Sequence, residues 1–228
     1  MQQENRTPEV EKQLAGLPFW PFLSEAEQAL VRERRMRMHY PAGAQVREGG
    51  GDCLGLIIVL SGDLRAYLLS PDGREMTLYN LRAGDTCVLA AACALDAISF
   101  ETHVVAEAES EVLVVPADVI AQLIRENIHA ECYTYKLATE RFSDVIAGVE
   151  RLVFFSIEQR IASYLLDEAA GSADDTIHRT HEQIAAGISS AREVVSRTLK
   201  DMARQGLVEL FRGGVRLLDK PALYRLIE

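Results

Sequence analysis

Short apolar runs separated by turn residues dominate the chain from about residue 40 to residue 115. The runs are Leu54–Leu60, Leu64–Leu69, Met76–Tyr79, Thr102–Glu107 and Glu111–Val115. The turns between them include Gly62 and the Pro71–Arg74 stretch, where proline and glycine suit a hairpin. Apolar runs of this length between turn signals are typical of strands. The pattern predicts an all-β module, a sandwich or barrel that closes its own edges.

Helical spacing of apolar residues precedes this β module. A helical preamble is predicted from Pro8 to about Met38, with a restart where Ser24 and Glu27 can form a capping box. Later in the chain, Ser156 and Gln159 offer a second box, from which a helix is expected to run to Glu168.

Between Pro116 and about Phe155 the helical period returns. Apolar or small residues recur there three and four positions apart, as in a heptad seam, at Tyr135, Ala138, Phe142, Val145, Val149 and Leu152. Such a stripe either pairs with a second copy of the chain or packs against its own domain. We favour the seam of a homodimer.

The last third of the chain is typical of two helices joined by a sharp turn. Thr180 and Gln183 can form a capping box for the first helix, which is expected to end near Gly187. The second helix is predicted to begin at Ser189 or Ser190. Its buried stripe is expected to be Val195, Leu199 and Met202.

The polar face of this second helix suits a reader of the major groove. Arginine can bind O6 and N7 of guanine together, glutamate can accept from the amino group of cytosine, and serine or lysine can hold phosphates. A β-hairpin or wing follows from about Gly206, in which Arg212 and Arg216 could touch the DNA backbone. The candidate DNA contacts are Thr180, Ser189, Ser190, Arg192, Glu193, Ser196, Arg197, Lys200 and Arg212. The alternative is a plain helical hairpin with solvated charges.

The distribution of charge changes the meaning of the acidic total. The 228 residues hold 24 Lys and Arg against 34 Asp and Glu, a net charge of −10 that by itself speaks against nucleic acid. Residues 1–155 carry 14 basic and 23 acidic residues, whereas residues 176–220 carry eight basic and five acidic ones. The acidity belongs to the first part, and the proposed reader is locally basic.

The sequence also indicates a cytoplasmic protein. It contains no apolar stretch of the length that a membrane span needs, and its first residues do not resemble a signal peptide. Its four cysteines, Cys53, Cys87, Cys93 and Cys132, are sparse for a chain that can build a core, so we expect thiols and no structural disulfides.

This order of parts resembles the Crp/Fnr superfamily of bacterial transcription regulators. The motifs that carry the resemblance are Ser190–Lys200, Tyr40–Gly43, Gly62-Asp63, Gly84-Asp85 and Ser156–Ile161. The resemblance implies an α+β protein with an N-terminal β-roll sensor domain, cupin-like and cyclic-nucleotide-binding-like, at residues 1–130. A dimerisation helix at 131–155 and a winged helix-turn-helix domain at 156–228 would follow.

The resemblance also implies partners and roles. Arg192, Glu193 and Arg197 match the positions at which the family reads bases. The expected partners are double-stranded DNA with a palindromic operator, a second copy of the chain and RNA polymerase, with no membrane. The long helix would transmit an effector signal from the β-roll to the two DNA readers.

The sensor region departs from two well-known subfamilies. The segment Leu89–Glu101 contains no Arg or Lys, and Phe100-Glu101 stands where the cyclic-AMP binders carry an Arg-Ser pair for the phosphate. The sequence therefore predicts an effector other than cyclic AMP. The first cysteine is Cys53, so the N-terminal cysteine group of the iron–sulfur Fnr type is absent.

The remaining candidates for effector or redox chemistry are Cys87, Cys93, His103 and Cys132. Thiolates beside an imidazole can bind haem iron or zinc, or can be oxidised as a redox sensor. Cys87 and Cys93 lie in an Ala-rich stretch predicted to be a short helix or tight loop; six residues apart on a regular helix, they would point to different sides. The alternative is that these thiols are core residues.

Two other classes of function are alternatives to a DNA-binding regulator. A small-molecule-binding or protein-interaction module without DNA readout would use the C-terminal domain for docking. An enzyme is not expected, because the sequence shows no convincing phosphate loop, metal-hydrolase helix or nucleophile elbow.

Overall fold

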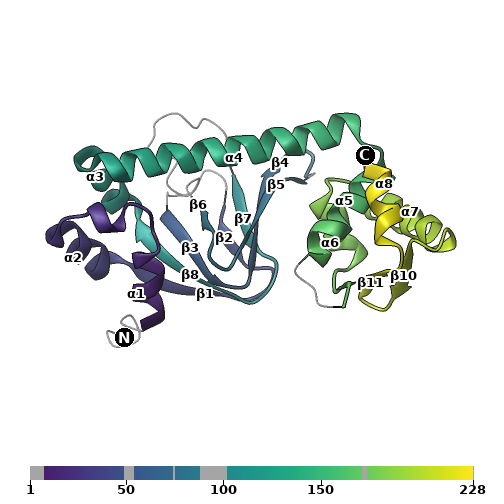
Figure 1. Ribbon diagram of the computed structural model, residues 1–228, viewed down its shortest axis with the longest axis horizontal. Helices are drawn as coiled ribbons and strands as arrows, with labels where there is room; N and C mark the ends of the chain where they lie inside the picture. The colour runs from purple at the N-terminus through teal and green to yellow at the C-terminus, as the bar shows by residue number, and fades with distance from the viewer. Residues whose placement is uncertain (1–7, 49–53, 74, 88–101, 171–173, 228) are drawn as a thin grey trace. The chain divides into compact units, whose positions relative to one another are not determined.

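A computed structural model describes residues 8–48, 54–73, 75–87, 102–170 and 174–227 (Figure 1). The chain divides into two compact units. The first comprises Met1–Leu68 with Leu78–Val145, and the second comprises Leu69–Thr77 with Ile146–Glu228. The α+β class predicted from the sequence is confirmed, with a β-sheet module followed by helices and a small C-terminal sheet.

Two four-stranded sheets form the β module. One has the strand order β1 (Met36–Tyr40), β8 (Ser110–Pro116), β3 (Gly55–Ser61) and β6 (Thr86–Cys87). The other has the order β2 (Gln45–Arg47), β7 (His103–Ala106), β4 (Asp63–Leu69) and β5 (Glu75–Arg82). The strand pairs with a described register are antiparallel. All five runs predicted as strands lie in these sheets.

Strand β3 is buried on both faces because it separates two hydrophobic cores. Ile57 and Val59 belong to the core of the β module, whereas Leu56, Ile58 and Leu60 belong to a core shared with helices. Those helices include α1 (Pro8–Ala15), the 3-10 turn η2 (Trp20–Phe22), α2 (Glu25–Arg34) and α3 (Ala117–Glu126). The unbroken apolar run from Leu56 to Leu60 is what a strand between two cores requires.

The helical preamble ends earlier than the sequence predicted. Helix α2 begins at a capping box of Ser24 and Glu27, as expected, but it stops at Arg34. Met36 then starts strand β1, which pairs with β8 from Met36 opposite Val114 to Tyr40 opposite Ser110. The prediction of helix to Met38 was wrong there because pairing with a distant strand outweighs local propensity.

The helical stretch after Pro116 is two helices rather than one. Helix α3 ends before Asn127, and α4 (Ile128–Phe154) follows along one side of the sheets (Figure 1). The Asn127 side-chain oxygen accepts from the backbone N–H groups of His129 at 3.0 Å and Ala130 at 3.4 Å, so this residue caps the start of α4. None of the helices in the described ranges is long and apolar enough to cross a bilayer.

The C-terminal part of the second unit is a small helical domain with a three-stranded sheet. Its helices are α5 (Ile157–Ala169), α6 (His181–Gly187), α7 (Arg192–Arg204) and α8 (Lys220–Ile227). Its sheet has the order β10 (Val208–Phe211), β11 (Gly214–Leu217) and β9 (Thr176–Ile177). The predicted hairpin is present as β10 and β11, and the predicted capping boxes at Ser156 and Thr180 are both present. Helix α8 and strand β9 were not predicted.

Candidate functional site: the helix pair α6–α7

Helix α7 is held to its domain by one apolar face. Val195, Leu199 and Met202 are each completely buried in the core of the C-terminal domain. That core also takes Ile184 and Ala185 from α6. The stripe predicted from the sequence is therefore the inner face of α7, and the opposite face points to solvent.

The turn between α6 and α7 contains both residues, Ser189 and Ser190, at which the sequence predicted α7 to begin. The Ser190 N–H donates to the Ala185 carbonyl at 2.9 Å, and the Ser189 N–H donates to the Ala186 carbonyl at 3.2 Å. Ser189 is left-handed, with φ of +54°. This is a Schellman motif, so Ser189 and Ser190 belong to the end of α6. The prediction that α7 begins at one of them was wrong, because α7 begins at Arg192.

Gly187 serves a different purpose from the one expected. It is the last residue of α6 and has no positive φ, so it does not form the sharp turn. A Cβ atom there would lie 2.4 Å from Cε2 of Tyr164 on α5. A glycine at this position lets α6 approach the Tyr164 ring closely.

The candidate DNA contacts on α7 share its outer face. Arg192, Glu193, Arg197 and Lys200 are exposed, and Ser196 is half-buried. The Arg192 guanidinium lies 3.7 Å from the Glu182 carboxylate of α6, with both side chains more than 60 % exposed. Such an exposed pair is weak, so Arg192 can exchange this partner for a base edge.

The other candidate DNA contacts lie at the start of α6 and on the β10–β11 hairpin. The Thr180 hydroxyl accepts from the Gln183 N–H at 3.2 Å, so it already caps α6. Arg212 is exposed in the loop of the β10–β11 hairpin. Arg216 donates to the Glu209 carboxylate at 3.1 Å, an ion pair on the hairpin itself. Arg212 is therefore the wing arginine better placed to meet a ligand.

His181 stands at the first position of α6, beside the polar face of α7. Burial lowers the pKa of its imidazole below the ordinary value of 6.5, and the positive charges of Arg192 and Lys200 lower it further. Both effects favour the neutral form of the imidazole.

The predicted effector residues are spread over separate elements. Cys87 is fully buried on β6, with its Sγ 3.7 Å from the Tyr79 hydroxyl. His103 lies on β7, in the other sheet, and its ring stacks on Tyr67 at 5.2 Å between centroids. Cys132 is an exposed thiol on α4, and Cys93 lies outside the described residues. Across the part of the chain that the structure describes, no three His, Cys, Asp or Glu side chains gather as a metal site.

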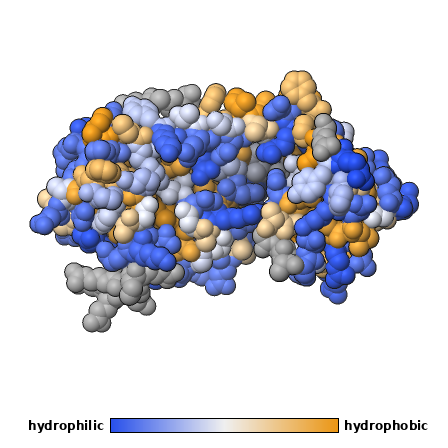
Figure 2. Space-filling view, viewed as in Figure 1, coloured by the Kyte–Doolittle hydropathy of each residue, from blue (hydrophilic) through white to orange (hydrophobic). Residues whose placement is uncertain are grey.

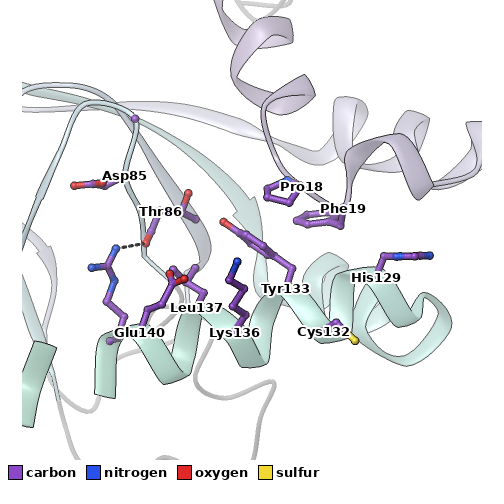
Figure 3. Close-up of a pocket in the computed structure, with 12 residues that line it drawn as sticks. Pro18, Phe19, Asp85, Thr86, His129, Cys132, Tyr133, Lys136, Leu137 and Glu140 are labelled. Atoms are coloured by element: carbon purple, nitrogen blue, oxygen red, sulfur yellow. Dashed lines mark hydrogen bonds between the residues drawn. The ribbon is translucent and has the colours of Figure 1, made fainter. Parts of the chain in front are cut away.

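A pocket of about 450 Å³ opens beside α4 in the first unit (Figure 3). Pro18 and Phe19 from the N-terminal segment form one wall, and the Tyr133 ring lies 5.2 Å from that of Phe19. Burial raises the pKa of the Tyr133 hydroxyl above its ordinary value, and a hydrogen bond with the Thr86 side chain offsets part of this rise. Arg141 donates to the Thr86 carbonyl at 3.4 Å.

Only Cys132 among the pocket residues was anticipated from the sequence. His129, Cys132, Lys136 and Glu140 reach the pocket because they recur three or four residues apart on α4. That spacing was visible in the sequence. The N-terminal wall was not, because only the tertiary fold brings Phe19 against Tyr133.

The predicted heptad seam is only partly exposed. Tyr135, Phe142 and Val149 are exposed, but Ala138 packs on the helical core and Val145 on the core of the β module. The second row of the exposed stripe consists of Ile146 and Val153, which are 49 % and 65 % exposed. Figure 2 shows apolar side chains along part of the upper edge, where Figure 1 draws α4. Val145 and Leu152 of the predicted seam are half-buried, whereas the residues that follow them, Ile146 and Val153, are exposed.

Two family models match the chain. A Crp-like helix-turn-helix domain matches residues 159–226, and a cyclic nucleotide-binding domain matches residues 37–127. The first contains the helix pair α6–α7 and the hairpin, and the second contains most of the β module.

Individual relatives extend these matches over most of the chain. The chain is 36 % identical to a solved transcriptional regulator of the Crp/Fnr family from Eubacterium rectale, covering 92 % of this chain and 97 % of that one, with a TM-score of 0.87. It is 32 % identical to the transcriptional regulator LdrP of Thermus thermophilus, covering 72 % and 83 %. A cyclic AMP receptor protein of Thermus thermophilus is 26 % identical, covering 92 % and 96 %.

We predict that His181 makes the C-terminal domain less stable in acid. Because its folded pKa is lowered, the unfolded state binds the proton more readily, and stability falls as the pH drops through 6.5. His181→Gln removes this linkage. Denaturant unfolding at pH 7.5 and 5.5 should show a smaller loss of stability for the variant than for the parent. Equal losses in the two proteins would contradict the assignment.

Proposed function

The chain belongs to the Crp/Fnr family of DNA-binding transcriptional regulators, and from that premise we propose that it binds a palindromic operator as a homodimer in the cytoplasm. An effector sensed in the β-roll, other than cyclic AMP, controls this binding. RNA polymerase is the proposed partner on the promoter. The observation that carries the proposal is the outer face of α7.

Helix α7 has one apolar face fixed in the core and an opposite polar face exposed to solvent. Burial of Val195, Leu199 and Met202 restricts its rotation about its own axis. Arg192 and Arg197 stay in solvent in the first half of the helix, where a recognition helix meets base edges. Each can bind a guanine with two hydrogen bonds, and Glu193 can accept from a cytosine. Lys200 and Arg212 supply phosphate contacts that orient the domain.

We expect Arg192→Ala or Arg197→Ala to weaken operator binding by about 1–3 kcal/mol each, because each removes a bidentate base contact. Binding to operator and scrambled duplexes, measured over a salt series, checks this. Arg225→Ala, an exposed arginine on α8, is the control and should bind as the parent does.

Unchanged discrimination between the two duplexes in both variants would contradict the role of α7. If the parent protein binds no genomic fragment even at low salt, the C-terminal domain is a docking module instead, since phosphate neutralisation always favours binding at low salt.

The exposed stripe of α4 supports the homodimer. Tyr135, Phe142, Ile146, Val149 and Val153 lie within about 60° of one another around the helix, at about 100° per residue. Packing against the same stripe of a second α4 helix would bury these apolar side chains and stabilise a dimer. A two-fold axis there would give the two α7 helices half-sites about one turn of DNA apart.

We expect Ile146→Glu to convert the dimer into a monomer, because it places a charge in the centre of the apolar stripe. Ala147→Glu is the matched control: Ala147 is also exposed but lies about 100° further round the helix. Sedimentation equilibrium on the full chain measures both. A monomeric parent, or equal effects of the two variants, would contradict the seam.

The candidate sites for an effector are the thiols identified from the sequence and the pocket found in the structure. Cys87 is buried beside the Tyr79 hydroxyl, while Cys132 lines the 450 Å³ pocket next to α4. Redox change at a thiol, a bound metal or haem, and a small molecule in the β-roll are the effector classes proposed. Each would act on α4 or on strands that pack against it.

We predict that cyclic AMP is not the effector, because Leu89–Glu101 has no cation for its phosphate. Isothermal titration of the purified protein with 3′,5′-cyclic AMP should give no heat of binding at concentrations up to about 1 mM, the low-affinity end of ligand binding. Operator affinity should likewise not change. Saturable binding in the micromolar range would contradict this.

A further inference from the structure

Three consecutive residues in the first turn of α5 reach three different parts of the C-terminal domain. The Glu158 carboxylate accepts from the side-chain amide of Gln205, at the C-terminal end of α7, at 3.3 Å. The Gln159 side-chain amide donates to the Leu226 carbonyl of α8 at 2.9 Å. The Arg160 guanidinium donates to the Ile188 carbonyl at 3.2 Å. This turn of α5 therefore contacts both ends of the recognition helix region.

The Arg160 contact is placed at the turn between α6 and α7. Ile188 is the C-cap of α6, its side chain is buried, and the next residue is the left-handed Ser189. A charge-assisted hydrogen bond to this carbonyl satisfies one of the acceptors left at a helix C-terminus. The Arg160 Nε is itself buried with no partner, and burial lowers the pKa of the guanidinium. The side chain is thus half-buried against the turn, with its Nε inaccessible to solvent.

A second contact lies one turn further along α5. Tyr164 follows Arg160 by four residues, so the two side chains share one face of the helix. The Tyr164 ring lies against Gly187, where any Cβ would come within 2.4 Å of the ring. Arg160 and Tyr164 therefore hold adjacent residues of the turn, one by a hydrogen bond and the other by close packing.

We propose that Arg160 is a positioning residue for DNA recognition: by holding the Ile188 carbonyl against α5, it sets the direction in which α7 leaves the turn. The inference rests on the proposed reading of DNA by α7. Only three residues separate Ile188 from Arg192, so a change in the direction of the turn moves the arginines of α7 directly. Arg160 itself needs no contact with DNA.

The test compares Arg160→Met, which keeps an aliphatic stem but loses the donor, with Arg160→Lys, which keeps a charge and a donor. Arg160→Met should weaken binding to the operator by about tenfold or more, the typical loss for a hydrogen bond to a charged group, and leave a scrambled duplex within about twofold. Arg160→Lys should recover most of the operator affinity. Arg225→Met controls for the loss of one positive charge in the same domain.

Hydrogen exchange in the free protein gives a readout that does not depend on DNA. In Arg160→Met the amides of Ser189 and Ser190 should exchange faster, while those of β10 and β11 keep the rates of the parent. Loss of affinity for both duplexes alike, with a shallower salt dependence, would show a phosphate contact and overturn the proposal. Unchanged operator binding would overturn it as well.

A second pair of variants tests the same turn if Arg160→Met unfolds. Gly187→Ala forces the Tyr164 ring or the turn to move, and should lose operator binding selectively. Tyr164→Leu in the same chain removes the clash and should restore part of it. No selective loss in Gly187→Ala would count against control of α7 through the turn. If the parent protein does not bind the operator more tightly than a scrambled duplex, the proposed function is refuted instead.

Discussion

Burial of one face of α7 is the constraint on which the rest of the C-terminal domain depends. Val195, Leu199 and Met202 are inaccessible to solvent, and they leave a helix of 13 residues no freedom to rotate without exposing them. Each is worth on the order of 1.5–3 kcal/mol of transfer free energy. The polar residues between them must then face outwards. The reading surface is thus a consequence of core packing, and it needs no further contact to keep its side chains in solvent.

Packing alone does not determine where that outward face points. The axis of α7 is also set at its two ends, and both ends meet the first turn of α5. Gln205 follows the last residue of α7 and bonds Glu158, while Ile188 precedes the helix and bonds Arg160. Because Phe155 and Ser156 alone separate α5 from α4, the helix with the exposed apolar stripe directly precedes the first turn of α5 along the chain. A movement of α4 therefore has only two residues to cross before it reaches the turn of α5 that contacts both ends of α7.

The first unit is organised by a strand between two cores. Strand β3 places alternate residues in the β module and in the helical core, so the N-terminal helices, α3 and the sheets share one apolar element. Helix α4 packs on both of these cores, through Leu137 and Ala138 on one and Val145 on the other. The pocket with Tyr133 and Cys132 lies on this helix too. A structural change in the β module or at the pocket would therefore act directly on α4, the helix that carries the exposed apolar stripe.

Local chemistry explains which parts were predictable from the sequence. Capping boxes at Ser24, Ser156 and Thr180 depend on residues three apart, and all three are present as predicted. The inner stripe of α7 and the hairpin after it follow from short-range periodicity in the same way. The acidic excess of residues 1–155 and the local excess of basic residues at 176–220 follow from counting charged residues alone.

Only the tertiary structure decided the features that join distant segments. Met36–Tyr40 is a strand because β8, some 70 residues later, offers the partner. Val145 was expected on the seam but covers the β module, so Ile146 takes the exposed row. Ser189 adopts a left-handed turn, and Gly187 is small because Tyr164 lies against it. Periodicity identifies that a helix has an apolar face, but what covers that face depends on chain elements that are far away in the sequence.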